Sequence, residues 1–250
     1  VVWDSGSRDN IDSKSFMPHF TPKPETRYYW KVFITDDVGE SATSDPAYFE
    51  TAPEKIKGKW ITAPFEKCSH GIYRRTFELS SEEDIKKARL YISGLGLYEV
   101  YLNGEKIGNE FLAPFYNDYN YWIQYQTYDI TNMLKVGINE LRVMLGNGWY
   151  KGRFGFIDNL DRLYGDRQIM ICQLTVDFKN SNQITIYSDE NFECQKSPIL
   201  ESSIYDGEIY DANLEPIEDK WMPVILADEE TQKLSLKLVP RYSLPLIIHE

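Results

Sequence analysis

The chain has few cysteines and no cysteine motif. Its 250 residues include 3 Cys, at Cys68, Cys172 and Cys194, without a CxxC pair. An odd number of widely spaced cysteines fits neither a disulfide framework nor a zinc site. We therefore expect unpaired thiols packed in the protein, which favours a reducing, cytoplasmic compartment.

Long apolar runs and an excess of positive charge are also absent. No stretch approaches the roughly 20 apolar residues that cross a bilayer. The first residues carry no basic and apolar leader, but the chain starts at Val1 and a leader removed by processing stays an alternative. The formal net charge of -12 would repel phosphate backbones and anionic lipid. We expect neither nucleic acid nor a membrane as a partner.

Helical periodicity is scarce, whereas strand-like runs are frequent. Aromatic residues make up 14% of the chain, with 18 Tyr, and short Val, Ile, Tyr and Thr runs alternate with polar residues. This pattern is typical of antiparallel sheets. Since 250 residues exceed the usual size of one domain, we predict an all-β protein of two antiparallel β-sandwiches.

Residues 1–52 predict a partial fibronectin-III-like sandwich. Residues 28–36 alternate aromatic and polar side chains like a central strand, and residues 47–51 are expected to pair with it. A complete domain of this kind has about seven strands. Only four or five fit here, so we expect the remaining strands to be missing or supplied elsewhere. Residues 53–59 are predicted to be a linker.

Residues 60–220 predict a jelly-roll, galactose-binding-like sandwich, because short strands and turn signals alternate along them. We expect residues 88–93 and 98–102 to pair as a hairpin that turns at Gly94 and Gly96. Residues 221–250 are rich in Leu and Pro, which predicts a connection into a following domain. The expected strands of this unit are 73–79, 88–93, 98–102, 124–128, 139–145, 169–178, 183–187 and 192–195.

The segment 146–156, GNGWYKGRFGF, is the most informative part of the chain. It holds four glycines, a Trp, a Tyr and an Arg between two strand-like runs. Glycine allows close approach of the backbone, and aromatic rings with Asn and Arg suit a sugar. A glycine-rich turn whose Trp caps the core is the alternative, and it is the more common case for such a segment alone.

Several neighbouring segments carry a family resemblance. They closely resemble, in the same order, the N-terminal β-sandwich region of bacterial α-L-rhamnosidases, the inverting glycosidases that remove terminal L-rhamnose. The resemblance spans roughly residues 60–215, and Trp3 to Gly6 with Arg27 to Trp30 is similar to the preceding fibronectin-III-like domain. The segments are LYISGLGLYEVYLNGE (90–105), LAP (112–114), YQTYDIT (125–131), YGDR (164–167) and YDGEIYDA (205–212).

The resemblance implies that catalysis belongs to another part of the polypeptide. The family's catalytic acids lie in a downstream (α/α) barrel, which requires helical periodicity that this chain lacks. Among 39 acidic residues some pair reaches the spacing of a glycosidase by chance, so their number decides nothing. We assign no catalytic residue and expect two partners, an L-rhamnose-containing oligosaccharide or glycoside and the downstream catalytic domain.

Two loops are predicted to bind carbohydrate. Aromatic side chains in them offer faces for a sugar ring, and Asn and Arg offer hydrogen bonds. Packing of Trp149 in the core is the alternative. The predicted carbohydrate-binding residues are Tyr116, Asn117, Asn120, Trp122, Asn147, Trp149, Arg153 and Tyr164.

No cofactor is required, but the same loops allow calcium. In some rhamnosidases a sandwich of this kind is a calcium-dependent L-rhamnose-binding module, and Asp118, Asp158 and Asp161 offer the oxygen donors that Ca²⁺ prefers. Asn120-Tyr121 stands where the resemblance implies an Asp-Asn pair, which weakens such a site. Solvated loop side chains are the alternative.

Two functions therefore stay open. The first is a carbohydrate-binding or substrate-positioning module. The second is a structural spacer that packs on the catalytic barrel, for which the Asp-Gly turn in residues 205–211 is a candidate docking element. A self-sufficient small hydrolase is disfavoured.

We predict that the purified chain does not hydrolyse aryl α-L-rhamnosides, because the resemblance assigns the catalytic acids to the downstream barrel. Release of 4-nitrophenol from its α-L-rhamnoside measures this directly. Turnover that disappears when an acidic residue of this chain is replaced would contradict the prediction.

Overall fold

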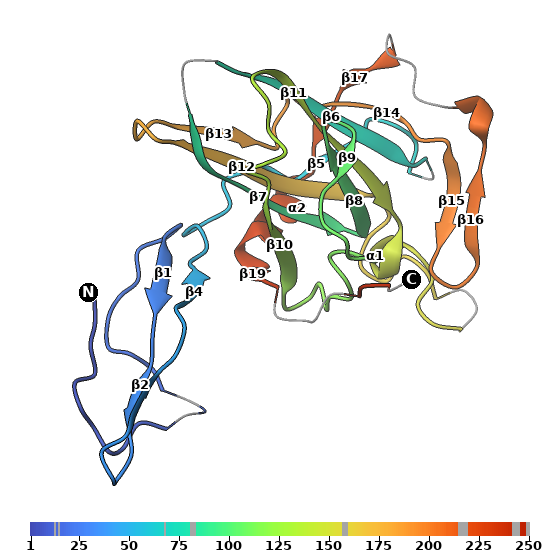
Figure 1. The fold of residues 1–250 in the computed structure, drawn as a ribbon. Coiled ribbons are helices and arrows are strands. Elements are labelled where there is room, and N and C mark those ends of the chain that lie inside the picture. Colours follow the sequence, from blue (N-terminus) through green and yellow to red (C-terminus); the bar gives the residue numbers. More distant parts are fainter. Residues whose placement is uncertain are drawn as a thin grey trace. The chain divides into compact units, whose positions relative to one another are not determined.

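The chain folds into two compact units, Val1–Lys55 and Ile56–Glu250 (Figure 1). Most of the regular secondary structure in both units consists of strands in antiparallel sheets, which confirms the predicted all-β class. No helix in the described part of the chain is long and apolar enough to cross a membrane. The computed structural model describes residues 1–12, 14, 16–67, 69–80, 84–156, 160–214, 220–241 and 246–248.

The smaller unit contains two antiparallel two-stranded sheets. Strand β1 (Arg27–Trp30) pairs with β4 (Ala47–Glu50), and β2 (Phe33–Thr35) pairs with β3 (Ser41–Thr43). The single strand expected over residues 28–36 is therefore wrong. At the break, the Val32 amide donates to Ser44 Oγ, and the Ser44 amide donates to the Val32 carbonyl.

The larger unit packs a six-stranded sheet against a seven-stranded sheet (Figure 1). The six-stranded sheet has the order β17-β14-β6-β11-β8-β9, and all its pairings are antiparallel. Its strands are β6 (Gly71–Leu79), β8 (Leu97–Leu102), β9 (Glu105–Lys106), β11 (Gly137–Gly146), β14 (Glu193–Lys196) and β17 (Met222–Pro223).

The seven-stranded sheet has the order β18-β5-β12-β7-β10-β19, with β13 also paired to β12. Only β10 and β19 pair in parallel. Its strands are β5 (Ile61–Thr62), β7 (Ile85–Leu95), β10 (Ile123–Asp129), β12 (Ile169–Phe178), β13 (Gln183–Tyr187), β18 (Ile225–Leu226) and β19 (Leu238–Pro240). A hairpin of β15 (Ile199–Ser203) and β16 (Gly207–Tyr210) forms a separate two-stranded sheet.

Strand β12 divides the apolar side chains of the larger unit between two cores. Met170, Cys172 and Leu174 join the core between the two sheets, whereas Ile169 and Ile171 join a second core. This follows from the two-residue period of a strand, because residues 169–176 of β12 are buried on both faces of the sheet. Each fully buried Ile or Leu contributes about 1.5 to 3 kcal/mol.

The second core is closed by the segment that was predicted to be a connection from residue 221 onward. This segment contains the helix α2 (Glu229–Lys233) and the 3-10 turn η3 (Leu234–Lys237), and a further 3-10 turn, η1 (Ala212–Leu214), precedes it in the chain. Leu234 and Leu238 pack on the core that contains Trp60. The Gln232 side chain accepts from the Trp60 amide at 3.0 Å and donates to the Trp60 carbonyl at 2.7 Å. Up to residue 240, this segment therefore packs on the sandwich.

The two glycines at 94 and 96 do not turn a hairpin, so that prediction is wrong. Strand β7 pairs with β10 and β12 in one sheet, and β8 pairs with β9 and β11 in the other. The chain crosses between the sheets at Gly96, where φ is +121°. A Cβ atom at Gly96 would overlap the carbonyl oxygen of Gly146, so only glycine fits this corner.

A buried histidine immediately precedes β6. His70 is 2% exposed, and neither ring nitrogen has a hydrogen-bond partner. Burial, assisted by the nearby Lys151 charge, lowers the pKa of His70 to about 4. The imidazole is therefore neutral at physiological pH. Cys172 and Cys194 are buried free thiols, and Cys68 lies outside the described residues.

Gly96→Ala should destabilise the larger unit by about 3 kcal/mol or more, because it adds backbone strain and a clash with Gly146. Gly104→Ala is the matched control, since Gly104 also has positive φ but nothing lies within 4 Å of its Cβ position. The control should lose only about 1 kcal/mol. Urea unfolding measures the free energy of unfolding of both variants. Equal losses would contradict a stabilising role of the close contact at Gly96.

The pKa of His70 predicts a pH-dependent stability. The folded value of about 4 lies below the unfolded value of about 6.5, so the unfolded state binds the proton first as the pH falls. Neutral His70 makes its full contribution to the free energy of unfolding above about pH 6.5. This contribution is lost as the pH falls towards 4. Between pH 7 and 4.5, the free energy of unfolding of His70→Leu should therefore fall by about 2 kcal/mol less than that of the parent. The exposed His19→Leu control should follow the parent, and a variant slope equal to the parent slope would refute the assignment.

Candidate functional site

Loops at one end of the larger unit bring aromatic side chains from four segments together. We call these nine rings the aromatic cluster. Ring contacts with centroid distances of 4.9 to 6.5 Å join them, together with hydrogen bonds between side chains. The cluster consists of Phe115, Tyr116, Tyr119, Trp149, Tyr150, Phe154, Phe156, Tyr164 and Tyr205.

The glycine-rich segment folds as a tight turn that contains the short helix α1 (Gly148–Lys151). Its glycines mainly accommodate other parts of the same protein. A Cβ on Gly148 would lie 2.9 Å from Leu97 Cγ, and one on Gly152 would overlap the Gly148 carbonyl oxygen. The sequence predicted a close approach of the backbone at these glycines. At Gly148 and Gly152, the group that the backbone approaches is another part of the same protein at the corner of the sandwich.

The inner part of the aromatic cluster belongs to the second core. Tyr119 and Tyr150 are 3% and 6% exposed, and Tyr164 packs against both. Burial raises the pKa of all three phenols, that of Tyr150 to about 12. These hydroxyls are therefore neutral at physiological pH, and the rings fix the loops to the sheet beneath them.

The outer part of the cluster reaches the surface. Phe115 and Tyr116 both contact the Trp149 ring edge to face at 5.9 Å. Phe115 and Tyr116 are 37% and 36% exposed, and Phe156 is 83% exposed. The structure therefore presents aromatic surface at the loops predicted from the sequence, with Tyr116, Trp149 and Tyr164 in one cluster.

Most polar groups around these rings bond to one another. Trp149 Nε1 donates to the Tyr205 hydroxyl at 3.0 Å, and Tyr116 and Tyr164 share a hydrogen bond of 3.4 Å between their hydroxyls. Arg153 forms an ion pair of 2.8 Å with Asp206. Arg153 is thus tied to the tip of the β15–β16 hairpin.

Two of the predicted Asn side chains hold the backbone. Asn147 Nδ2 donates to the Ser202 carbonyl at 3.0 Å, and its Oδ1 accepts from Gln168 Nε2. Asn117 is fully buried, and its Oδ1 accepts from the Gln124 amide at 2.8 Å. Both amides therefore position the loops.

Two further predicted residues lie at the surface of the first loop. Asn120 is exposed, and its backbone amide donates to Asp118 Oδ1 at 3.1 Å. Trp122 is 37% exposed at the end of the same loop. Both residues lie in the same loop as Tyr116 and Tyr119 of the aromatic cluster.

The predicted calcium donors do not form a cluster among the described residues. Asp118 accepts from the Asn120 amide, and Asp161 forms an ion pair of 3.3 Å with Arg162. Asp158 lies outside the described residues. Within the described ranges, no group of three His, Cys, Asp or Glu side chains is placed to hold a metal ion. The described donors therefore do not make up a calcium site by themselves.

Sequence reasoning missed the contribution of the β15–β16 hairpin. Tyr205 and Asp206 at its tip bond to Trp149 and Arg153, and the Phe156 ring contacts Tyr205 at 5.2 Å. The YDGEIYDA motif marked this turn, but the pairing of segments 50 residues apart is set by the tertiary fold. Phe115 and Phe154 were missed because single apolar residues in loops carry no periodic signal.

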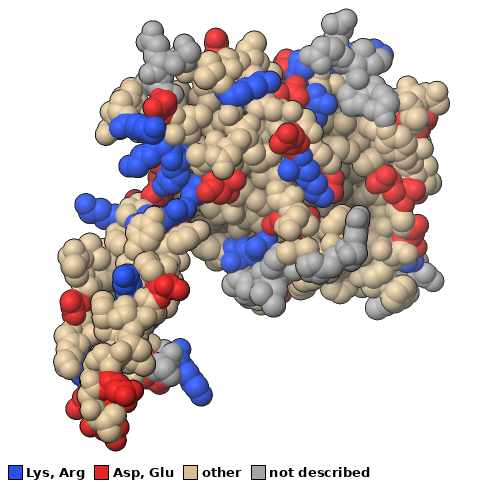
Figure 2. All heavy atoms as spheres, in the orientation of Figure 1, with Lys and Arg blue, Asp and Glu red and all other residues tan. Residues whose placement is uncertain are grey.

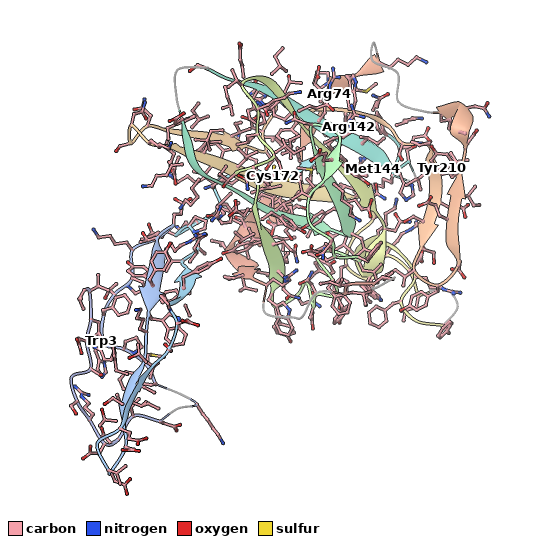
Figure 3. All side chains as sticks on the ribbon, viewed as in Figure 1. Trp3, Arg74, Arg142, Met144, Cys172 and Tyr210 are labelled. Atoms are coloured by element: carbon pink, nitrogen blue, oxygen red, sulfur yellow. The ribbon has the colours of Figure 1, made fainter. Side chains whose placement is uncertain are left out.

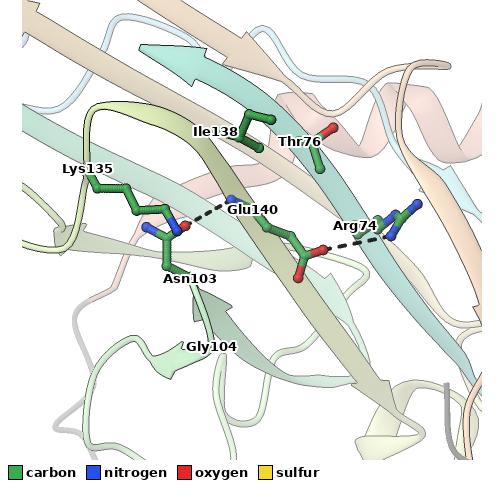
Figure 4. A pocket seen from close by; sticks show the side chains of 7 residues that line it. All are labelled: Arg74, Thr76, Asn103, Gly104, Lys135, Ile138 and Glu140. Carbon is green, nitrogen blue, oxygen red and sulfur yellow. Dashed lines mark hydrogen bonds and ion pairs between the residues drawn. The ribbon is translucent and has the colours of Figure 1, made fainter. Parts of the chain in front are cut away.

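A second concave surface lies on the outer face of the six-stranded sheet. It is an open hollow lined by Arg74, Thr76, Asn103, Gly104, Lys135, Ile138 and Glu140 (Figure 4). Arg74 and Arg142 lie on this sheet (Figure 3), with guanidinium groups 4.2 and 5.6 Å from the Trp221 ring.

The charged groups of this hollow are largely paired. Arg74 donates to Glu193 at 2.9 Å, and Arg142 pairs with Glu140 at 2.7 Å. Asn103 accepts from the Glu140 amide and donates to Asn139. On the visible face of the larger unit, acidic and basic side chains are likewise mixed (Figure 2). The aromatic cluster is therefore the better candidate site.

Comparison with protein families identifies both units. Residues 83–244 match the model described as alpha-L-rhamnosidase N-terminal domain. Residues 1–54 match a Rha78A-like, N-terminal immunoglobulin domain. Immunoglobulin and fibronectin-III domains share a sandwich architecture, so the finer fibronectin-III assignment stays a prediction.

Individual α-L-rhamnosidases are similar to the chain. One from Streptomyces avermitilis is 37% identical over 187 residues, covering 74% of this chain and 17% of the relative. One from Formosa agariphila is 31% identical, covering 86% of this chain and 25% of the relative. The solved α-L-rhamnosidase of Dictyoglumus thermophilum matches all of this chain, at 30% identity and a TM-score of 0.84.

The chain spans only part of the relatives that it matches. It covers 30% of the Dictyoglumus thermophilum chain and 27% of the solved α-L-rhamnosidase from Aspergillus terreus, which has 26% identity and a TM-score of 0.79 over 87% of this chain. The family match nevertheless extends over more than half of the present sequence. The chain belongs to the α-L-rhamnosidase N-terminal domain family.

Proposed function

We propose that the chain is a non-catalytic, carbohydrate-binding or substrate-positioning part of an α-L-rhamnosidase. Its ligand is an L-rhamnose-containing oligosaccharide or glycoside, and the aromatic cluster is the contact surface. The observation that supports this most is the exposure of Phe115, Tyr116 and Phe156 at the surface loops. Exposed aromatic groups at loop ends are typical of ligand sites.

The chemistry of L-rhamnose fits such a surface. It is a 6-deoxy sugar, so its C5 methyl group and axial hydrogens form an apolar face. This face can pack on Tyr116 and Trp149 while the hydroxyls point towards water or towards the exposed Asn120. Calcium is a further proposal, in which Asp118 and the acidic residues of 158–161 supply oxygen donors.

The rest of the polypeptide is the second proposed partner. Relatives named α-L-rhamnosidase are about four times longer than the part that this chain covers. Catalysis would belong to that remainder, and the aromatic cluster would hold part of a glycan near it. Because the two parts share one polypeptide, even a weak sugar contact would be useful at the resulting effective concentration.

A structural spacer is the second candidate function, and the β15–β16 hairpin favours it. Leu200, Ile209 and Tyr210 are between 46% and 51% exposed on this hairpin. Tyr205 and Asp206 fix its tip, and the Asp211 amide donates to the Pro198 carbonyl at its base. A fixed hairpin with exposed apolar side chains suits docking to another domain.

Calorimetric titration with L-rhamnose tests the proposed function. The parent should bind at millimolar sugar, and Trp149→Ala should weaken binding by about fivefold or more, because loss of the ring contact costs about 1 to 3 kcal/mol. Asn120→Ala and Asp161→Ala probe the polar rim, with and without Ca²⁺. Tyr210→Ala is the matched control, since Tyr210 is an exposed tyrosine outside the aromatic cluster.

The outcomes separate the two candidate functions. If the parent binds and Trp149→Ala, Asn120→Ala and Asp161→Ala all keep its affinity, the sugar site lies elsewhere. If the parent does not bind L-rhamnose at millimolar concentration with Ca²⁺ present, the spacer function is favoured. Circular dichroism of each variant checks that the fold is retained.

A further inference from the structure

We propose that the outer part of the aromatic cluster binds a planar, uncharged aromatic group, such as the aglycone of an aryl glycoside. This inference rests on the proposed function, because it concerns the same glycoside ligand. It extends that function from the sugar to the group attached to it. The contact surface is formed by Phe115, Tyr116, Trp149 and Phe156.

The first argument is that, among the described residues, the polar atoms of the Trp149 and Tyr116 rings bond within the protein. Trp149 Nε1 donates to Tyr205, and the Tyr116 hydroxyl bonds to the Tyr164 hydroxyl. Hydroxyl groups of a sugar pressed against these rings would give up hydrogen bonds to water and find few replacements. A flat apolar ring loses no hydrogen bonds there, so the surface favours it over a hydroxylated ring.

The second argument is the geometry of the rings. The Tyr116 ring meets Trp149 at 86° and Phe115 meets it at 70°, both with centroids 5.9 Å apart. These rings therefore meet edge to face and are not stacked on each other. Their partly exposed faces can accept one more ring by offset stacking or edge contact, which are the favoured arrangements of aromatic pairs.

The third argument is the position of Phe156. Its side chain is 83% exposed while one side of the ring contacts Tyr205 at 5.2 Å. The preceding Gly155 has φ of +69°, and no described residue lies within 4 Å of its Cβ position. A large apolar side chain is thus presented at the open rim of the cluster, where it can pack on a ligand ring.

The fourth argument is the distribution of charge. The Arg153 guanidinium lies 5.6 Å from the Tyr205 ring and is already paired with Asp206. The chain as a whole carries a formal charge of -12. The net negative charge therefore disfavours an anionic aromatic ligand, and the charge of Arg153 is already offset by Asp206. A neutral ring avoids this repulsion.

Titration calorimetry of the chain with four glycosides tests the inference. The probes are methyl and 4-nitrophenyl α-L-rhamnoside, and methyl and 4-nitrophenyl α-D-mannoside. The aryl group should lower Kd at least tenfold relative to methyl, with either sugar. This aryl-to-methyl ratio should fall below about threefold in Tyr116→Ala and in Phe115→Ala, and it should be unchanged in Tyr210→Ala. Circular dichroism shows whether each variant is folded, and two separate ring variants guard against the failure of one.

Each result has a distinct meaning. A parent that binds methyl and aryl α-L-rhamnoside equally well overturns this inference and leaves the sugar-binding function standing. Aryl binding without detectable methyl α-L-rhamnoside binding supports the inference and contradicts a site for L-rhamnose itself. An aryl preference that persists in both ring variants places the aromatic group elsewhere, and this also overturns the inference. Failure of all four probes contradicts both proposals and favours the spacer.

Discussion

The close contact of two backbone segments at Gly96 is the constraint on which the larger unit depends. Here the chain leaves one sheet for the other, and the carbonyl of Gly146 occupies the space that a side chain would need. Gly148 lies against Leu97 at the same corner. Since the α1 turn starts from this contact, the position of Trp149 follows from the packing of these glycines against the protein itself.

The strand content could be read from the sequence with considerable accuracy. The run 169–178 coincides with β12, and 183–187 coincides with β13. These strands alternate or are continuously apolar, so their side chains carry a local signal. The predicted pairing of 88–93 with 98–102 is wrong, because a hairpin turn and a crossover between sheets can both use glycines at these positions. Only the packing of the second sheet distinguishes them.

The candidate site could be predicted only in part. The segments that meet in the aromatic cluster were marked by Gly, Trp and Tyr, and Tyr116, Trp149 and Tyr164 do lie together. The polar residues could not be assigned in the same way. Asn147 and Asn117 look like sugar ligands in the sequence, but tertiary partners such as Ser202 and Gln124 use their amide groups. The hydrogen-bonding groups that a side chain can offer to a ligand therefore depend on its neighbours in space.

The second core also dictates when the protein can fold during synthesis. Trp60 is made early, yet the Gln232 side chain that bonds to its backbone follows 172 residues later. Leu234 and Leu238, which complete the same core, come later still. On a ribosome that adds about 5 to 20 residues each second, the apolar surface around Trp60 stays uncovered for about ten seconds or longer.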